Sequence, residues 1–326
     1  MSESTIRTES EPLKYRKKTF FQKIGPVYYA LLLLCVVGAI TQPTFLSLRN
    51  LRNVIISGTP LAIVTIGQTM TLLPAGIDLT IGPVISLTNT IAAFLTKPYP
   101  DRVFEIVVLC LASGLLIGLA NGLAIAYLRL NPFIITLATG IIIQGLTLGI
   151  MYQPGGLVTP DFVKIAKISI GPIPYAFFYI IILYLVGTYI LRRTPFGLSI
   201  YAIGGNETSA RLSGIRTKRV LIYVYMISGF MASLAGLFIA SRIGSGDPIV
   251  GDPFSLDSIT AAVLGGTSIF GGVGTLIGGL AGAFIITILS TILNLNNISP
   301  FYQWIAKGIT LIAALAIDLW RTRSEK

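Results

Sequence analysis

Residues able to do covalent or metal chemistry are scarce in this chain of 326 residues. It has no histidine, and its two cysteines, Cys35 and Cys110, both lie within apolar runs. The chain therefore lacks the commonest proton relay and metal ligand, and the cysteines indicate neither a disulfide nor a metal site. No GxxxxGKS or GxxxxGKT sequence occurs, which excludes a P-loop for ATP. We predict that the chain is not an enzyme and binds no metal or cofactor.

Four carboxamides stand inside otherwise apolar stretches: Gln68, Asn89, Asn121 and Gln144. An amide in hydrocarbon needs a hydrogen-bond partner, which is either a neighbouring helix or a polar solute passing by. The sequence leaves both alternatives open, and we take these residues as candidates for the lining of a solute pathway. Pairs of carboxylates are absent from the same stretches, which weakens a proton- or sodium-coupled mechanism.

The elements that must position these residues are apolar helices long enough to cross a membrane. Hydrophobic residues make up 53% of the chain and charged residues 11%, whereas soluble domains carry roughly 25% charge. A helix needs about 20 residues to cross a bilayer. We predict an all-α polytopic membrane protein with ten spans, at about 24–41, 54–73, 79–96, 103–128, 131–151, 175–191, 220–241, 257–270, 273–294 and 301–318.

Basic residues flank these spans unevenly. Ten is an even number, so both termini lie on one side of the membrane. If that side is the cytoplasm, it holds 16 of the 24 lysines and arginines, which supports an N-in, C-in topology. Arg49 and Arg52 run against the bias, and we expect them on a short interfacial helix. The same distribution argues that the net charge of +11 is a topology signal and not a nucleic-acid site.

The predicted organisation is a cytoplasmic tail over 1–23, a transmembrane domain over 24–318 and a second tail over 319–326. The longest cytoplasmic loop covers 192–219, and an outward loop at about 152–174 is rich in Pro and Gly. Part of the outward loop is expected to dip into the protein. Spans 2–5 and 7–10 run in opposite directions, the arrangement that an inverted repeat would produce.

The first motif, Pro74-Ala75-Gly76-Ile77-Asp78-Leu79-Thr80-Ile81-Gly82-Pro83, lies between two apolar spans. We expect a structured turn built on Gly76, Asp78 and Gly82, with Asp78 accepting hydrogen bonds from the N–H groups of Thr80 and Ile81. An ordinary cap at the membrane interface, with no part in transport, is the competing interpretation.

The second motif lies in the cytoplasmic loop and reads YAIGGNETSARLSGI over 201–215. Asn206 is a good helix N-cap, Glu207 suits the first turn and Gly214 suits the stop. We predict a short helix over about 207–213 that docks into a partner's groove with Ala210 buried there. A plain solvated helix is the alternative. The residues assigned to the contact are Gly205, Asn206, Glu207, Ala210, Arg211, Leu212 and Gly214.

The third motif reads LDSITAAVLGGTSIFGGVG over 256–274, and Gly278, Gly279 and Gly282 continue its small residues. Small residues let helix backbones approach closely, and pairs of glycines interrupt helices. Tight packing alone would explain the motif equally well.

Together the three motifs resemble the ribose/xylose/arabinose/galactoside-type permease subunits of bacterial ATP-binding-cassette (ABC) importers. GIDLTIGP at 76–83 is similar to their GIDLSVG signature, and the other two motifs are similar to their YAIGGN/AARLSGI and LDAIAAVVLGGTS segments. Order and spacing agree over about residues 45–318. Two positions depart from the pattern, since Ala75 stands where the family has glycine and Ser255 stands where it has an acid.

The resemblance implies a subunit of the inner (plasma) membrane without chemistry of its own. Its expected partners are ATPase subunits docked on the 207–213 helix, a second permease subunit, and a periplasmic or lipid-tethered sugar-binding protein. The implied solute is a pentose or hexose. A nucleoside, polyol or furanose signal remains open within the same importer type. From other classes, a stand-alone secondary transporter would need an ion-coupling site, and a membrane-embedded enzyme would need the histidines or clustered acids that the chain lacks.

Overall fold

The computed structural model describes residues 26–96 and 99–324, and this part of the chain is helical except for loops and one two-stranded hairpin. The N-terminal tail predicted over 1–23 lies outside the described residues. The helices and strands are α2 (Pro26–Thr41), α3 (Leu48–Leu72), α4 (Ile81–Thr96), the 3-10 turn η1 (Pro100–Arg102), α5 (Val103–Leu128), α6 (Pro132–Ile150), α7 (Pro160–Lys167), β1 (Ser169–Ile170), β2 (Ile173–Pro174), α8 (Tyr175–Arg193), α9 (Pro195–Gly205), α10 (Glu207–Leu212), α11 (Thr217–Ile243), α12 (Asp252–Leu264), α13 (Leu276–Leu295) and α14 (Pro300–Ser324).

Each of the ten predicted spans corresponds to one helix of this fold. Six helices of the described chain are long and apolar enough to cross a membrane: α3, α5 (taken together with η1), α6, α8, α11 and α13. The helices α2, α4 and α12 are shorter, and α14 runs on to Ser324 through the region predicted as a C-terminal tail. The fold is therefore an all-α polytopic membrane protein.

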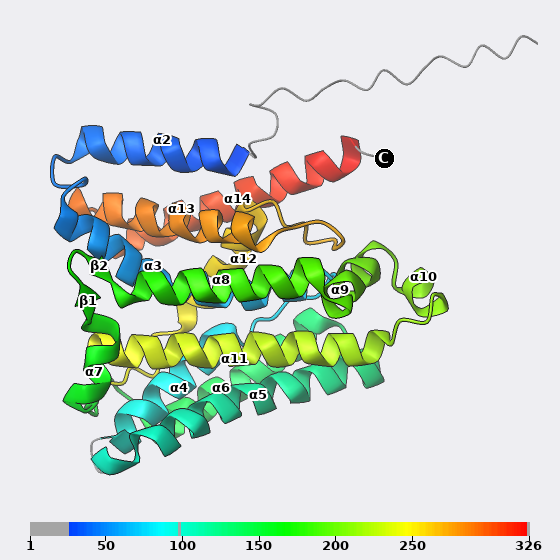
Figure 1. Ribbon diagram of the computed structural model, residues 1–326, viewed down its shortest axis with the longest axis horizontal. Helices are drawn as coiled ribbons and strands as arrows, with labels where there is room; N and C mark the ends of the chain where they lie inside the picture. Colours follow the sequence, from blue (N-terminus) through cyan, green and yellow to red (C-terminus); the bar gives the residue numbers. More distant parts are fainter. Residues whose placement is uncertain (1–25, 97–98, 325–326) are drawn as a thin grey trace, which may run out of the picture.

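The long helices lie side by side along the long axis of the molecule (Figure 1). The start of α2 and the end of α14 both lie at the end that holds α9 and α10, which we call the α10 end. The opposite end holds α7 and the β1–β2 hairpin, and we call it the α7 end (Figure 1). The first and last described helices, α2 and α14, therefore run in opposite directions.

The helix α3 forms the centre of the bundle. Every residue of its second half, from Gly58 to Leu72, is buried, and it packs against α8, α11, α12 and α13. By contrast, α5, α6 and α8 expose large apolar side chains such as Leu116, Ile141 and Leu185. Apolar side chains exposed along whole helices indicate contact with lipid.

Glycines set a close helix contact between α5 and α11. A Cβ built on Gly118 would lie 2.2 Å from the carbonyl oxygen of Tyr225, and one built on Gly114 would lie 2.3 Å from that of Gly229. These distances leave no room for a side chain, so the two backbones touch. Close backbone approach through glycines four residues apart is how membrane helices gain packing energy without a hydrophobic driving force.

The loops differ in how they match the predictions. The outward loop at 152–174 forms α7 and the hairpin, and Phe162 and Ala166 within it are buried. Ser241 of α11 both donates to the Phe162 carbonyl at 2.6 Å and accepts from the Ala166 N–H at 3.0 Å. The expectation for two arginines needs correction. Arg49 and Arg52 lie within the first turns of α3 and not on a separate interfacial helix. Arg52 donates a hydrogen bond of 2.8 Å to the Ser169 hydroxyl, which ties α3 to the hairpin.

Candidate functional site

The three sequence motifs, far apart in the chain, meet at the α10 end. The backbone N–H of Gly272 donates to the carbonyl oxygen of Leu73, just after α3, at 2.8 Å. A Cβ on Gly204 of α9 would lie 1.9 Å from that same oxygen and 2.4 Å from the Gly272 nitrogen. We call this contact of residues 73–76, Gly204 and Gly271–Gly272 the three-segment junction. Because it joins backbone to backbone, α9 cannot move without displacing the other two segments.

A tyrosine reinforces the junction from α9. The Tyr201 hydroxyl donates to the carbonyl oxygen of Gly274 at 2.8 Å. Burial raises the pKa of this phenol, and nearby Arg192 lowers it by a smaller amount. The group therefore stays protonated and keeps its donor at neutral pH.

The turn after α3 closes in a left-handed conformation at Ala75, whose φ is +61°. The N–H groups of Ala75 and Gly76 bond back to the carbonyls of Leu72 and Thr71, at 2.8 and 2.9 Å, which is the Schellman pattern of helix ends. A Cβ on Gly76 would meet the buried Tyr225 hydroxyl at 2.5 Å. Glycine is thus required at 76, while Ala75 occupies a conformation that favours glycine.

Asp78 is completely buried, which does not fit a solvated cap at the membrane interface. Its carboxylate accepts from both the backbone N–H (2.9 Å) and the hydroxyl of Thr80, and Asn121 donates to that hydroxyl at 3.2 Å. The bond to the Thr80 N–H confirms one predicted contact. Asp78 closes a turn ahead of α4, however. It does not accept the second predicted hydrogen bond, the one from the Ile81 N–H. The Ser228 hydroxyl of α11 also lies against the carboxylate.

The first turns of α4 and α12 touch through two matched glycine–serine pairs. The N–H of Gly82 donates to the Ser255 hydroxyl at 3.0 Å, and the N–H of Gly251 donates to the Ser86 hydroxyl at 2.9 Å. In both helices the serine follows its glycine by four residues. A Cβ on Gly82 would lie 2.6 Å from the Gly251 oxygen, and one on Gly251 would lie 1.9 Å from the Gly82 oxygen. The two helix starts therefore meet about a local two-fold relation.

The short helix of the second motif is confirmed as α10, over Glu207–Leu212. The side-chain oxygen of Asn206 accepts from the Ser209 N–H at 2.8 Å, as the cap prediction requires, and Gly214 adopts φ +86° at the stop. The preceding YAIGG segment is also helical, because it forms the end of α9, which the sequence did not predict. Gly205 is the last residue of that helix.

The predicted orientation of α10 is wrong. Ala210 is only 4% exposed because its side chain already packs within this chain's own core, so it is not free to enter a partner's groove. Leu212 is 82% exposed, and Glu207 and Arg211 are exposed beside it. The face available to a partner is therefore the one that carries these three residues.

A cavity of about 860 Å³ opens beside α10, between the end of α5 and the start of α11. Six charged residues line it, and five of them are basic: Arg129, Glu207, Arg211, Arg216, Lys218 and Arg219. The residues Pro74–Gly76 of the junction form another part of its wall. A positive potential in this cavity complements an acidic surface on a partner.

Three of the four candidate pathway amides bond within the chain. Asn89 accepts from the Asp247 N–H at 2.7 Å, Gln144 donates to the Pro248 carbonyl at 2.8 Å, and Asn121 bonds Thr80 as described above. Asn89 and Asn121 are at most 1% exposed. The alternative that these amides hold elements of the protein together is therefore the one that the geometry favours. Gln68 is fully buried, and neither atom of its amide has a hydrogen-bond partner in the described part of the chain.

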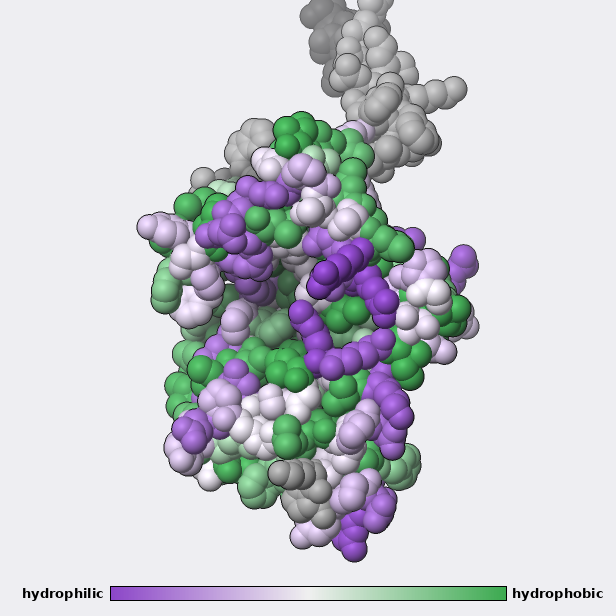
Figure 2. Space-filling view, turned by 90° about the vertical axis from the view of Figure 1, so that its left-hand side faces the viewer, coloured by the Kyte–Doolittle hydropathy of each residue, from purple (hydrophilic) through white to green (hydrophobic). Residues whose placement is uncertain are grey.

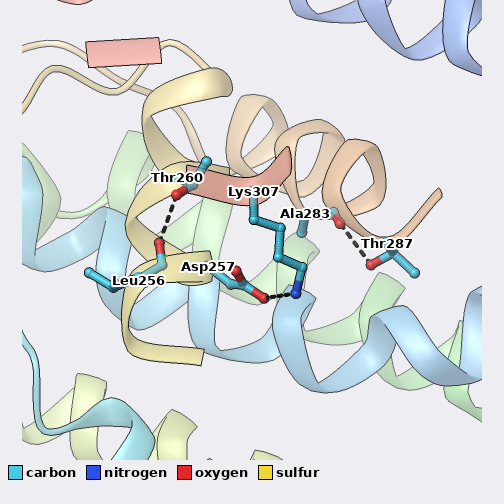
Figure 3. A network of polar contacts seen from close by, with 6 residues as sticks. All are labelled: Leu256, Asp257, Thr260, Ala283, Thr287 and Lys307. Carbon is cyan, nitrogen blue, oxygen red and sulfur yellow. Dashed lines mark hydrogen bonds and ion pairs between the residues drawn. The ribbon is translucent and has the colours of Figure 1, made fainter. Parts of the chain in front are cut away.

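The sequence analysis missed an ion pair between two helices at the α7 end. Lys307 of α14 bonds Asp257 of α12 at 2.6 Å (Figure 3). Their side chains are only 23% and 13% exposed. A single lysine in the middle of the predicted span 301–318 was the available signal, since an ionisable group within a membrane helix is costly unless it has a partner or a function.

Comparisons with known proteins agree with this arrangement. The family model described as "branched-chain amino acid transport system / permease component" matches residues 50–315. The chain is 38% identical over 298 residues to the ribose import permease protein of Haemophilus influenzae, covering 89% of this chain and 91% of that protein. It is 34% identical over 323 residues to the ribose import permease protein of Bacillus subtilis, covering 98% of each. No solved structure matches the chain.

A second group of relatives is named for a different sugar. The galactose/methyl galactoside import permease protein of Escherichia coli is 34% identical over 324 residues, covering 93% of this chain and 96% of that protein. All three matches extend over nearly the whole of both chains.

Proposed function

The chain belongs to the permease-component family of branched-chain amino acid transport systems, and we propose that it imports a monosaccharide as the membrane-spanning subunit of an ABC importer. It is a multi-pass inner-membrane protein and not an enzyme, since ATP hydrolysis in such importers takes place on separate ATPase subunits. The observation that carries the choice of solute is the near-complete match to relatives named for ribose and for galactose. A nucleoside or a polyol is the alternative within this importer type.

The topology that fits this role has ten crossings with both termini in the cytoplasm. Helix α12 has 13 residues, which rise only about 20 Å and cannot cross a bilayer core of about 30 Å. The neighbouring irregular segments would complete its crossing, and the same holds for α4. The paired contacts of Gly82 with Ser255 and of Gly251 with Ser86 support the inverted repeat of spans 2–5 and 7–10. Both chain termini lie outside the described residues, so their cytoplasmic position stays a prediction.

ATPase subunits would dock at the α10 end. The exposed Leu212 supplies an apolar contact, and the basic cavity beside it attracts an acidic surface. Movement of α9 and α10 would then reach the bundle through the three-segment junction, because Gly204 leaves no space to absorb it. A second permease subunit would complete the pathway, and the sugar-binding protein would dock at the α7 end.

Reconstitution tests the proposal directly. The chain, its ATPase and its receptor in proteoliposomes should take up labelled ribose or galactose only when ATP is supplied. Uptake by the chain alone in ATP-free vesicles would identify a secondary transporter, for which Asp257 and Lys307 are the candidate coupling groups. Uptake of a branched-chain amino acid in place of either sugar would overturn the assignment of the solute class.

A further inference from the structure

The α7 end contains a polar cavity that is separate from the junction and from α10. Its volume is about 370 Å³, within the range of small-molecule sites. The lining comes from the first turns of α3, α12 and α14 and from the last turns of α11 and α13. Figure 2 looks onto this end and shows its upper half hollowed between hydrophilic residues.

The cavity is lined by side chains that can form hydrogen bonds with the hydroxyl groups of a solute. Ten of the 14 lining residues are polar, including Asn53 and Ser290, and Arg242, Asp257 and Lys307 are charged. A sugar presents many hydroxyls, each both a donor and an acceptor, and carboxylates, amides and cationic side chains match them. Phe254 lines the same space and offers an aromatic ring to the apolar C–H face of a sugar ring.

The ion pair in this cavity has bonding capacity to spare. An ammonium group has three N–H donors and a carboxylate two acceptor oxygens, and one bond of each is used between Lys307 and Asp257. The pair lies about two helical turns below the start of α14, since Lys307 is the eighth residue of that helix. A buried pair adds little to stability compared with apolar residues of the same size, and this one lines the cavity with both of its groups.

We propose that this cavity binds the transported monosaccharide on the receptor side of the membrane, with Asp257 and Lys307 bonding its hydroxyls and Phe254 packing on its ring. The assignment rests on the proposed function, because it takes a sugar as the solute. Receptor docking at the α7 end would release the sugar directly above the cavity. The four carboxamides expected from the sequence to line the pathway lie outside it.

Protection from a thiol reagent tests binding without requiring transport. In a background of Cys35→Ala and Cys110→Ala, Ser290→Cys should react with a water-soluble maleimide added from the α7 side. Ribose or galactose should slow that reaction about tenfold, and leucine should leave it unchanged. Asp161→Cys, at an 88% exposed position of the same end but outside the cavity, serves as the control, and its reaction should be insensitive to either sugar.

Uptake by the reconstituted complex gives the second readout. Asp257→Asn and Lys307→Gln should each lower sugar uptake about tenfold or more, while Asp161→Asn, which breaks an exposed pair with Lys164 at the same end, should not. Asn53→Ala should change the ratio of ribose to galactose uptake, which a merely structural residue would leave constant. The exchanged pair Asp257→Lys with Lys307→Asp should assemble normally yet remain inactive.

Two results would overturn the inference while leaving the proposed function intact. One is sugar uptake by the wild-type complex with no protection of Ser290→Cys. The other is restoration of wild-type uptake and sugar ratio by the exchanged pair, which would make the ion pair structural. If the wild-type complex imports no sugar but imports leucine, the proposed function itself fails, and protection of Ser290→Cys by leucine would mark the cavity as an amino-acid site.

Discussion

The two ends of this molecule differ in how their segments meet, although each has a cavity; the one beside α10, of about 860 Å³, is lined mainly by basic side chains that suit an acidic protein surface. At the α10 end, the three-segment junction is backbone against backbone, with Gly204 so close to Leu73 that a single methyl group would overlap its oxygen. At the α7 end, five helices hold a cavity of about 370 Å³ between polar side chains. A packed contact transmits displacement because it cannot be compressed, and an open polar space accommodates a solute. The comparison assigns coupling to one end and binding to the other.

The largest effect is expected from filling the junction. Gly204→Ala would put a Cβ 1.9 Å from the Leu73 oxygen, so the segments must separate, at a cost of about 3 kcal/mol or more because backbone atoms cannot rotate away. Purified complex and uptake should both fall at least severalfold. The matched control is Gly205→Ala, where nothing lies within 4 Å of the added methyl. Equal behaviour of the two variants would disprove the close contact.

Next in size is the buried carboxylate between α3 and α4. Asp78→Leu removes the acceptor of both Thr80 bonds and should lower the free energy of unfolding by about 1–3 kcal/mol, the cost of unpaired buried donors. Thermal unfolding in detergent measures it. Asp78→Asn keeps an acceptor oxygen and should cost less. A Leu variant as stable as the wild type would show that the turn does not depend on this residue.

The junction and the cavity differ in how far the sequence predicted them. The three segments of the junction lie in or beside contiguous motifs, so the motifs could be selected from the chain alone, and the cap at Asn206 followed from local rules. The contact between them could not, because it joins residues far apart in the chain. The orientation of Ala210 was wrong because burial within the chain is decided by its packing against α9 and α11, which no local pattern encodes.

The cavity could not be predicted in the same way. Its residues come from five helices, four of them from α3, six from α13 and one or two from each of the others. Asp257 and Lys307 are 50 residues apart, so a lysine within a span signals that a partner is needed but does not identify it. The pathway amides illustrate the converse error, since Asn89 and Gln144 stood out in sequence but bond the loop between α11 and α12. A polar side chain inside a span indicates that a hydrogen-bond partner is needed, but the sequence does not identify that partner.

A smaller effect should separate the amides from the cavity. Gln144→Leu loses its bond to Pro248 and should destabilise the protein by about 0.6 kcal/mol, the usual value for a hydrogen bond in a membrane protein. Uptake per folded complex should stay at the wild-type level. A change in the ratio of ribose to galactose uptake in this variant would return Gln144 to the pathway.

The smallest expected change is a gain in stability. Ala75 adopts φ +61° at an exposed site, and Ala75→Gly relieves this conformation at the expense of a more flexible unfolded chain. The net stabilisation should be at most about 1 kcal/mol, seen as a slightly higher unfolding temperature. Ala75→Val should shift the temperature the other way, and a rise with valine would contradict the strained turn.

The division of labour between the two ends is tested most directly by measuring receptor-stimulated ATP hydrolysis and sugar uptake side by side for Leu212→Asp and Asp257→Asn. Leu212 is exposed, so its variant should fold normally yet lose ATPase association and, with it, both activities. Asp257→Asn should retain the ATPase and its stimulation by the receptor while sugar uptake falls about tenfold. If both variants lose the two activities in parallel, or if Asp257→Asn transports like the wild type, the separation of coupling from binding is wrong.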